Sequence, residues 1–148
     1  MSGTRARSLL EDCDRGTLST QGAAFDAPYG SFVRYALDEQ GRPLFLLSDL
    51  AVHTSNLETS ARSSLLVVRH PGADDPLDGE RATLVGSTER RDVSDADRRL
   101  YLDRHPSAEQ YVDFEDFHFY SMTPERVRFI GGFGDVEWIE PGDLRGGE

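Results

Sequence analysis

Four polar side chains lie close together in the sequence, directly after a short apolar run, and their types suit the binding of an anion. Ser48 ends the apolar run, and His53, Thr54 and Asn56 follow shortly after it. Residues 52–61 have helix-compatible spacing, so free N–H groups at a helix N-terminus would lie beside them. Hydroxyl, amide and imidazole groups at such a terminus favour negative charge. This polar run therefore predicts an anion-binding turn between a strand and a helix.

An upstream strand is expected to bring further side chains to the same turn. Turn residues at 38–41 separate two apolar runs, so residues 31–37 and 44–47 are predicted to pair as an antiparallel hairpin. The run at 44–47 lacks alternation and is expected to be buried on both faces. Ser31 would then lie near the open end of the hairpin, close to the polar run. Because side chains alternate along a strand, one face of this strand carries Ser31, Val33 and Tyr35.

Other interpretations of these residues are open. In one alternative, Ser48 and Thr54 merely cap the helix and His53 lies on the surface. Thr54 or Ser55 would then be the residue that caps the helix N-terminus. His118 lies among aromatic residues in a strand pattern, where an imidazole is either an axial ligand to haem or an ordinary hydrogen-bonded histidine. A Gly-x-Ser-x-Gly nucleophile elbow is missing from the sequence, which disfavours hydrolysis by an activated serine.

Charge and composition exclude several classes of function. A formal net charge of -11 argues against nucleic acid as a partner, because affinity for phosphate backbones comes from clustered cations. All 16 basic residues are arginines, which excludes Schiff-base chemistry and a P-loop lysine. The single cysteine, Cys13, cannot form an internal disulfide, and the 4 histidines lack zinc-site spacing. A resident metal ion is therefore not expected, haem iron apart.

Length and hydropathy indicate one domain in the cytoplasm. The 148 residues, of which 37% are hydrophobic, suit a single core. Apolar runs stay well short of the roughly 20 residues that a membrane-spanning helix needs, so a membrane is not an expected partner. Residues 1–7 lack the apolar stretch of a secretion signal, and we therefore expect a cytoplasmic protein.

Periodicity predicts a mainly β fold with a few helices. A short helix over one end of a sheet is indicated by the apolar stripe Ala6, Leu9, Leu10 and Cys13. Strand patterns recur along the chain between Gly, Pro and Asp turn residues. They fall at residues 16–21, 31–37, 44–47, 63–69, 81–91, 117–122, 126–131 and 136–139. Six or more strands with few helices indicate a closed or partly closed β-barrel.

Three segments carry a shared motif pattern. The first has Tyr-Gly-Ser at 29–31 and Leu-Ser-Asp-Leu-Ala-Val-His-Thr-Ser-Asn-Leu at 47–57. The others are residues 81–90, with a glycine at position 86, and residues 126–134, which end in Gly-Gly-Phe-Gly. In this order they resemble the pyridoxamine 5'-phosphate oxidase-like split-barrel flavin-binding family, most of all its haem-utilisation branch. The matches extend over roughly residues 9–144.

The resemblance implies a six-stranded antiparallel split β-barrel with flanking helices, an α+β fold that pairs as a homodimer. It implies FMN in two symmetric clefts at the dimer interface. We expect one FMN-binding domain at 1–144 and a disordered tail at 145–148. Positions that match the family's phosphate grip are Ser48, His53 and Thr54, with Asn56 adjacent. Positions that match the strand along the ribityl chain and ring are Ser31, Val33 and Tyr35, and Arg81 matches a contact to the flavin ring.

Three hypotheses about function follow. The leading one is an FMN-dependent oxidoreductase that acts on a small-molecule substrate or redox partner, with F420 as another possible flavin-type ligand. The second is a haem-binding or haem-degrading protein on the same barrel, with His118 as the iron ligand. The third is a non-catalytic dimeric module. Vitamin B6 oxidation is not expected, because His53 and Thr54 replace the arginine-lysine phosphate pair of the oxidase proper.

Overall fold

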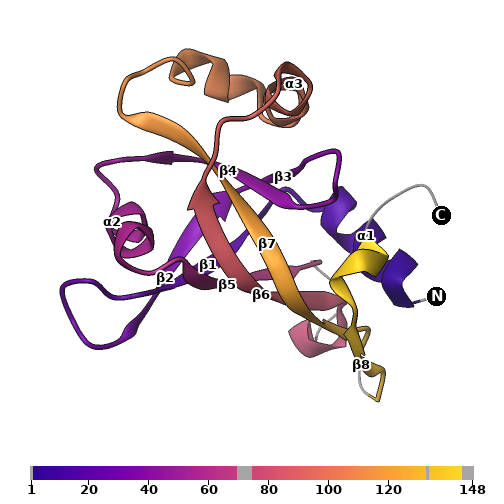
Figure 1. The fold of residues 1–148 in the computed structure, drawn as a ribbon. Helices are drawn as coiled ribbons and strands as arrows, with labels where there is room; N and C mark the ends of the chain where they lie inside the picture. The colour runs from indigo at the N-terminus through magenta and orange to yellow at the C-terminus, as the bar shows by residue number, and fades with distance from the viewer. Residues whose placement is uncertain (1, 70–74, 133, 145–148) are drawn as a thin grey trace.

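The computed structural model describes residues 2–69, 75–132 and 134–144, and in that part of the chain the strands form one sheet (Figure 1). The strands are β1 (Arg15–Gln21), β2 (Pro28–Arg34), β3 (Ala36–Leu37), β4 (Pro43–Ser48), β5 (Arg62–Val68), β6 (Arg81–Arg90), β7 (Phe117–Ile130) and β8 (Val136–Ile139). The helices are α1 (Ser2–Asp12), α2 (Val52–Thr59) and α3 (Asp95–Arg104), with 3-10 turns η1 (Pro76–Asp78), η2 (Pro106–Gln110) and η3 (Pro141–Leu144).

The sheet curls into a barrel because its two ends belong to one stretch of chain. Its strand order is β2-β1-β5-β6-β7-β4-β3, with β8 paired to β7, and all pairs are antiparallel. The first strand of that order ends at Arg34 and the last begins at Ala36, so Tyr35 alone joins them. The predicted mainly β barrel with flanking helices is confirmed, with 8 strands in the sheet rather than six.

Two helices lie at opposite ends of the barrel, as Figure 1 shows, with α1 near the chain termini and α2 at the far end. The predicted stripe on α1 is confirmed, because Ala6, Leu9 and Leu10 are buried in the main core. That core fills the barrel with aliphatic and aromatic side chains such as Leu65 and Phe129. The barrel is therefore closed by apolar packing at the α1 end.

A second core lies on the outer side of β4, under α3. Tyr101 of α3 meets Phe119 of β7 edge-on, with ring centroids 5.5 Å apart. Leu44 and Leu46 pack in this second cluster, whereas Phe45 and Leu47 point into the main core. The prediction that residues 44–47 are buried on both faces is confirmed.

The predicted hairpin between residues 31–37 and 44–47 forms at its turn but is shorter than expected. Only Ala36 and Leu37 pair with β4, opposite Leu44 and Pro43, while β2 pairs with β1 instead. The chain changes sheet edge at Tyr35, whose N–H donates to the carbonyl of Asp14 at 3.0 Å. Turn residues predict where a hairpin reverses but not how far its strands pair, so the predicted pairing was too long.

Two further predictions differ from the structure or lie outside it. Residues 117–122 and 126–131 were expected to be separate strands, but β7 is continuous through Pro124. A bulge absorbs the extra residue, because Val85 pairs with Arg126 and Gly86 with Pro124. The expected disordered tail at 145–148 lies outside the described residues.

Candidate functional site

The polar run forms the turn that carries the chain from β4 into α2, at the end of the barrel. Thr54 Oγ1 donates to the carbonyl of Ser48 at 2.6 Å, and Ser48 Oγ accepts from the Leu50 N–H at 3.1 Å. The N-cap residue is Ala51, which makes no side-chain cap bond, so the expected cap by Thr54 or Ser55 is wrong. These hydroxyls fix the turn itself.

A layer of buried polar groups lies beneath α2. Asn56 Nδ2 donates to Thr20 Oγ1 at 3.0 Å, and Asn56 Oδ1 accepts from the Ala23 N–H at 2.8 Å. Close by in the sheet, the hydroxyls of Ser63 and Thr88 lie 2.7 Å apart. Asn56 therefore ties α2 to β1 and to the loop after it. Its amide is occupied within the chain, as a buried polar group requires.

Two buried polar atoms near this layer have no partner in the described part of the chain. They are His53 Nε2 on α2 and Ser31 Oγ on β2, a strand that α2 contacts. Burial lowers the pKa of His53, so its imidazole is neutral at pH 7. A neutral imidazole offers one donor and one acceptor nitrogen, and leaving either unsatisfied when buried is costly. Within the polar layer beneath α2, the hydrogen-bonding capacity of these two atoms is not used by any described residue.

His118 lies on the other side of the same turn, where β7 begins opposite Leu47 of β4. Its Nε2 is 3.2 Å from Asp49 Oδ2, and its side chain is 22% exposed. The Asp49 N–H donates to the Asp116 carbonyl at 2.7 Å, which holds the two loops together. A carboxylate that holds one ring nitrogen orients the imidazole and makes its other nitrogen a better metal ligand.

Exposed apolar side chains lie on the two loops that meet at the Asp49–Asp116 backbone bond. Leu50, next to Asp49 in the turn, is 86% exposed, and Phe114 lies exposed in the facing loop. Single exposed apolar residues are common, but these two lie on loops that a backbone bond from Asp49 to Asp116 holds together. The turn thus offers an imidazole with apolar side chains on the adjoining loops.

The other predicted site residues do not gather here. Val33 and Tyr35 are buried in the main core, where the Tyr35 hydroxyl donates to the carbonyl of Leu10 at 2.7 Å and burial raises its pKa. Arg81 lies at the start of β6, the opposite end from Thr88, and its Nη1 donates to the Leu77 carbonyl at 3.0 Å. At roughly 3.3 Å per residue, about 20 Å of strand separates it from the α2 end.

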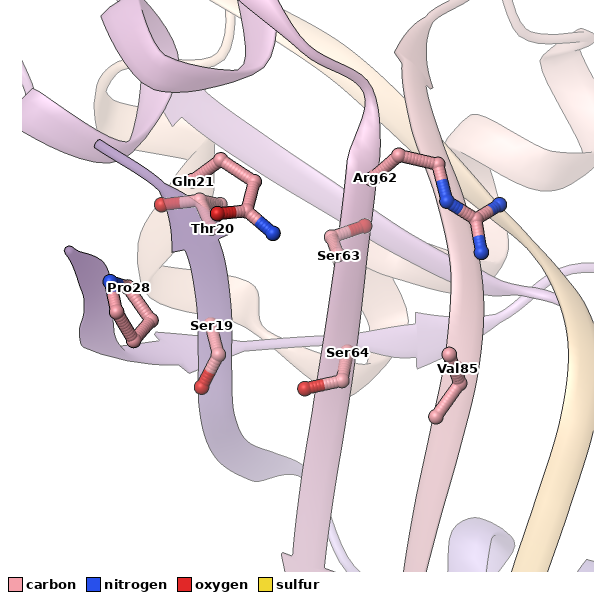
Figure 2. Close-up of a pocket in the computed structure, with 8 residues that line it drawn as sticks. All are labelled: Ser19, Thr20, Gln21, Pro28, Arg62, Ser63, Ser64 and Val85. Carbon is pink, nitrogen blue, oxygen red and sulfur yellow. The ribbon is translucent and has the colours of Figure 1, made fainter. Parts of the chain in front are cut away.

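A hollow that the sequence did not predict lies on the outer face of β1 and β5 (Figure 2). Its volume is about 340 Å³, and Ser19, Gln21, Arg62, Ser64 and Val85 are among the residues that line it. The signal was present, because both strands alternate buried residues with outward-facing serines. Serine is common in surface strands, so the alternation did not single the hollow out.

Clustered metal-binding side chains and membrane-spanning helices are not found in the described ranges. Within residues 2–69, 75–132 and 134–144, groups of three or more His, Cys, Asp or Glu side chains placed to hold a metal ion are missing. In the same ranges every helix is too short or too polar to traverse a bilayer.

The fold and the site define a split-barrel protein whose α2 end is polar. The family model named CREG, beta-barrel matches residues 2–144, and the chain belongs to that family. The expected link to flavin-binding split barrels is thus supported for the barrel and not for the flavin.

Relatives of this chain include haem proteins. It is 38% identical over 129 residues to HOZ, a chloroplastic haem oxygenase of Arabidopsis thaliana, a match over 85% of this chain and 39% of that protein. A haem-binding protein from Mycobacterium smegmatis superimposes with a TM-score of 0.90 at 32% identity, covering 98% of this chain and 60% of the other. The protein Atu2129 of Agrobacterium tumefaciens, of unknown function, superimposes with a TM-score of 0.83 at 28% identity, covering 98% of this chain and 60% of the other. The chain thus spans less than two thirds of each.

The prediction of FMN as cofactor is wrong, and an FMN-dependent oxidoreductase is not supported as the function. Relatives at 38% and 32% identity carry haem in their names, and neither is named for a flavin. The physical reason lies in the polar run. Thr54 and Asn56 are buried and hydrogen-bonded within the chain, and burial keeps His53 neutral. The expected phosphate grip therefore has no cation and few uncommitted donors.

Proposed function

We propose that this chain is a haem-binding protein, with its haem site at the turn between β4 and α2. The likeness to a haem oxygenase at 38% identity and to a haem-binding protein at 32% supports haem as the ligand class. The observation that carries the placement is the contact between His118 Nε2 and Asp49 Oδ2 at 3.2 Å. His105 fits less well because it is buried and bonded to the Tyr35 carbonyl, and His53 has no carboxylate partner among the described residues.

The residues around this turn fit a haem group. His118 would ligate iron through Nδ1, since Asp49 occupies the Nε2 side, and the carboxylate would raise the basicity of the ligand. Leu50 and Phe114 would supply apolar contacts to the porphyrin. Bound haem supplies a redox-active iron, whose properties the axial ligand and its surroundings tune.

Titration of the purified protein with haemin tests the proposal. We expect a saturable shift of the Soret band that reaches its limit at a fixed ratio of haem to protein. Protoporphyrin without iron is the matched control, and we expect it to bind more weakly because it cannot use an imidazole ligand. A Soret band identical to that of free haemin at every ratio would contradict the proposal and favour a module without a ligand.

Homodimer formation is also proposed, through a row of side chains on the outer face of the sheet. Strand register places six of them side by side across the sheet. This outer row consists of Phe32, Thr17, Leu66, Thr83, Arg128 and Trp138. Phe32 is 77% exposed and Trp138 is 60% exposed, with the Arg128 guanidinium 4.9 Å from the Trp138 ring centroid. Exposed aromatic and arginine side chains in a continuous patch are typical of protein interfaces.

Phe32→Glu is expected to dissociate the dimer. A charge placed at a buried apolar contact loses its hydration, and interface hot spots are worth about 2 kcal/mol or more, so the dimer Kd should rise roughly 30-fold. Light scattering over a dilution series measures the change. Leu100→Glu, at an exposed position on α3, is the control and should leave the dimer intact. A wild-type protein that is monomeric at every concentration would contradict the proposed dimer.

A further inference from the structure

The hollow on the outer face has the size and lining of a small-ligand site. It lies where β1 ends and β5 begins, two residues away from the outer row on each strand. Its volume of about 340 Å³ falls in the range of ligand pockets. Among the described residues that line it, none is acidic, although the chain holds 27 Asp and Glu. An acid-free hollow that contains an arginine stands out in a protein with a net charge of -11.

Hydroxyl and amide groups in the hollow are uncommitted. Ser19 and Ser64 face each other directly in the β1 and β5 pair, and Figure 2 shows the Ser64 hydroxyl turned toward the Ser19 side. Neither hydroxyl, nor the Gln21 amide, has a hydrogen-bond partner in the described part of the chain. The Cβ atoms of directly opposed residues lie about 5 Å apart, so both hydroxyls can donate to the same carboxylate or phosphate group of a ligand. The hollow therefore presents several donors at once.

Arg62 provides the cation. Its Nη1 donates to Glu125 Oε2 at 2.7 Å and to Ser87 Oγ at 3.3 Å, and the side chain is 52% exposed. Its Nε and Nη2 have no partner among the described residues. A guanidinium has a fork of donors that matches carboxylate and phosphate oxygens, so one edge is left for a ligand. Because Glu125 holds the other edge, it both positions Arg62 and competes with an anion for it.

We propose that this hollow binds the anionic group, a carboxylate or a phosphate, of a small ligand. Arg62 contacts the anion, and Ser19, Ser64 and Gln21 donate hydrogen bonds to it. Val85 forms an apolar wall beside these groups. The site is separate from the turn that carries His118, and it does not depend on haem binding.

Amide NMR spectra of the intact protein, titrated with inorganic phosphate and separately with acetate, test this proposal. We expect saturable shifts confined to the amides of Ser19, Gln21, Arg62 and Ser64 and their neighbours. The tighter of the two probes identifies which anionic group the hollow prefers. Shifts that never saturate, or that spread evenly over the surface, would overturn the proposal.

Three variants make the test specific to Arg62. Arg62→Ala should weaken binding more than tenfold, while Glu125→Gln should strengthen it because the guanidinium loses its competing partner. Arg81→Ala removes an arginine at the opposite end of β6 and should leave the affinity unchanged. If Arg62→Ala binds as the wild type does, or Glu125→Gln binds more weakly, the assignment of Arg62 is overturned. All three positions are on the surface, so the fold should survive each change.

Discussion

Replacing His118 with alanine is expected to abolish most of the Soret shift on haem titration. In the proposed site His118 is the iron ligand and Asp49 its hydrogen-bond partner, 3.2 Å from Nε2. Loss of such an outer partner alone typically lowers metal affinity by about 10 to 100-fold, so Asp49→Asn should fall in that range and His118→Ala beyond it. Absorption titrations of the wild type and both variants measure this order.

His53→Ala is the matched control for this experiment. It removes another imidazole beside the same turn, and the described structure gives His53 no carboxylate partner. We expect its haem affinity to stay near that of the wild type. If His53→Ala loses the Soret shift and His118→Ala keeps it, the iron ligand is His53 Nε2 on α2, and the assignment to His118 is wrong. Circular dichroism of each variant separates loss of a ligand from loss of the fold.

Sequence proximity predicted that the polar run gathers at one turn, because Ser48 and Asn56 bound a short segment of the chain. It did not predict what those residues would do there. Thr54 bonds the Ser48 carbonyl and Asn56 bonds Thr20, which is 36 residues away in the sequence. Such a partner depends on the path of β1 beneath α2. The sequence therefore predicted that these residues share a turn, while only the structure showed which of their donors are occupied.

Long-range pairing decides where the predicted site residues outside the polar run lie. Ser31, Val33 and Tyr35 do alternate along one strand pattern, but β2 pairs with β1, and Tyr35 turns into the core at the junction with β3. Arg81 matched a family position, yet it lies at the end of β6 away from α2. Strand order and direction are set by tertiary packing, which local propensity does not encode.

The cofactor was mispredicted because one barrel can hold different ligands. Motif order identified the fold correctly, but fold alone does not determine function, and the site must be argued from its own residues. Here the informative signs were the lack of lysine, the neutral His53 and the carboxylate beside His118. The first of these was visible in the sequence and favours a ligand that does not need a strongly cationic phosphate grip.

The bulge between β6 and β7 depends on a single glycine. Gly86 pairs with Pro124, which has no N–H, and the ladder shifts by one residue between Val85 and Gly86. A Cβ added at Gly86 would clash with the Thr123 carbonyl oxygen and lie 3.0 Å from Pro124 Cα. Both of these atoms belong to the backbone, so no side-chain rotation can relieve the contact. The two strands would have to separate where they form a long pairing of the barrel.

Gly86→Ala is therefore expected to destabilise the protein by about 3 kcal/mol or more, at the upper end of the cost of overpacking. With urea m-values of about 1 to 3 kcal/mol/M, the unfolding midpoint should fall by roughly 1 M or more. Gly30→Ala on β2 is the control, because its Cβ would meet only Thr17 Cγ2 at 3.4 Å, an ordinary contact. Midpoints that agree for the two variants would show that the strands accommodate the added methyl group, and the bulge would then need another explanation.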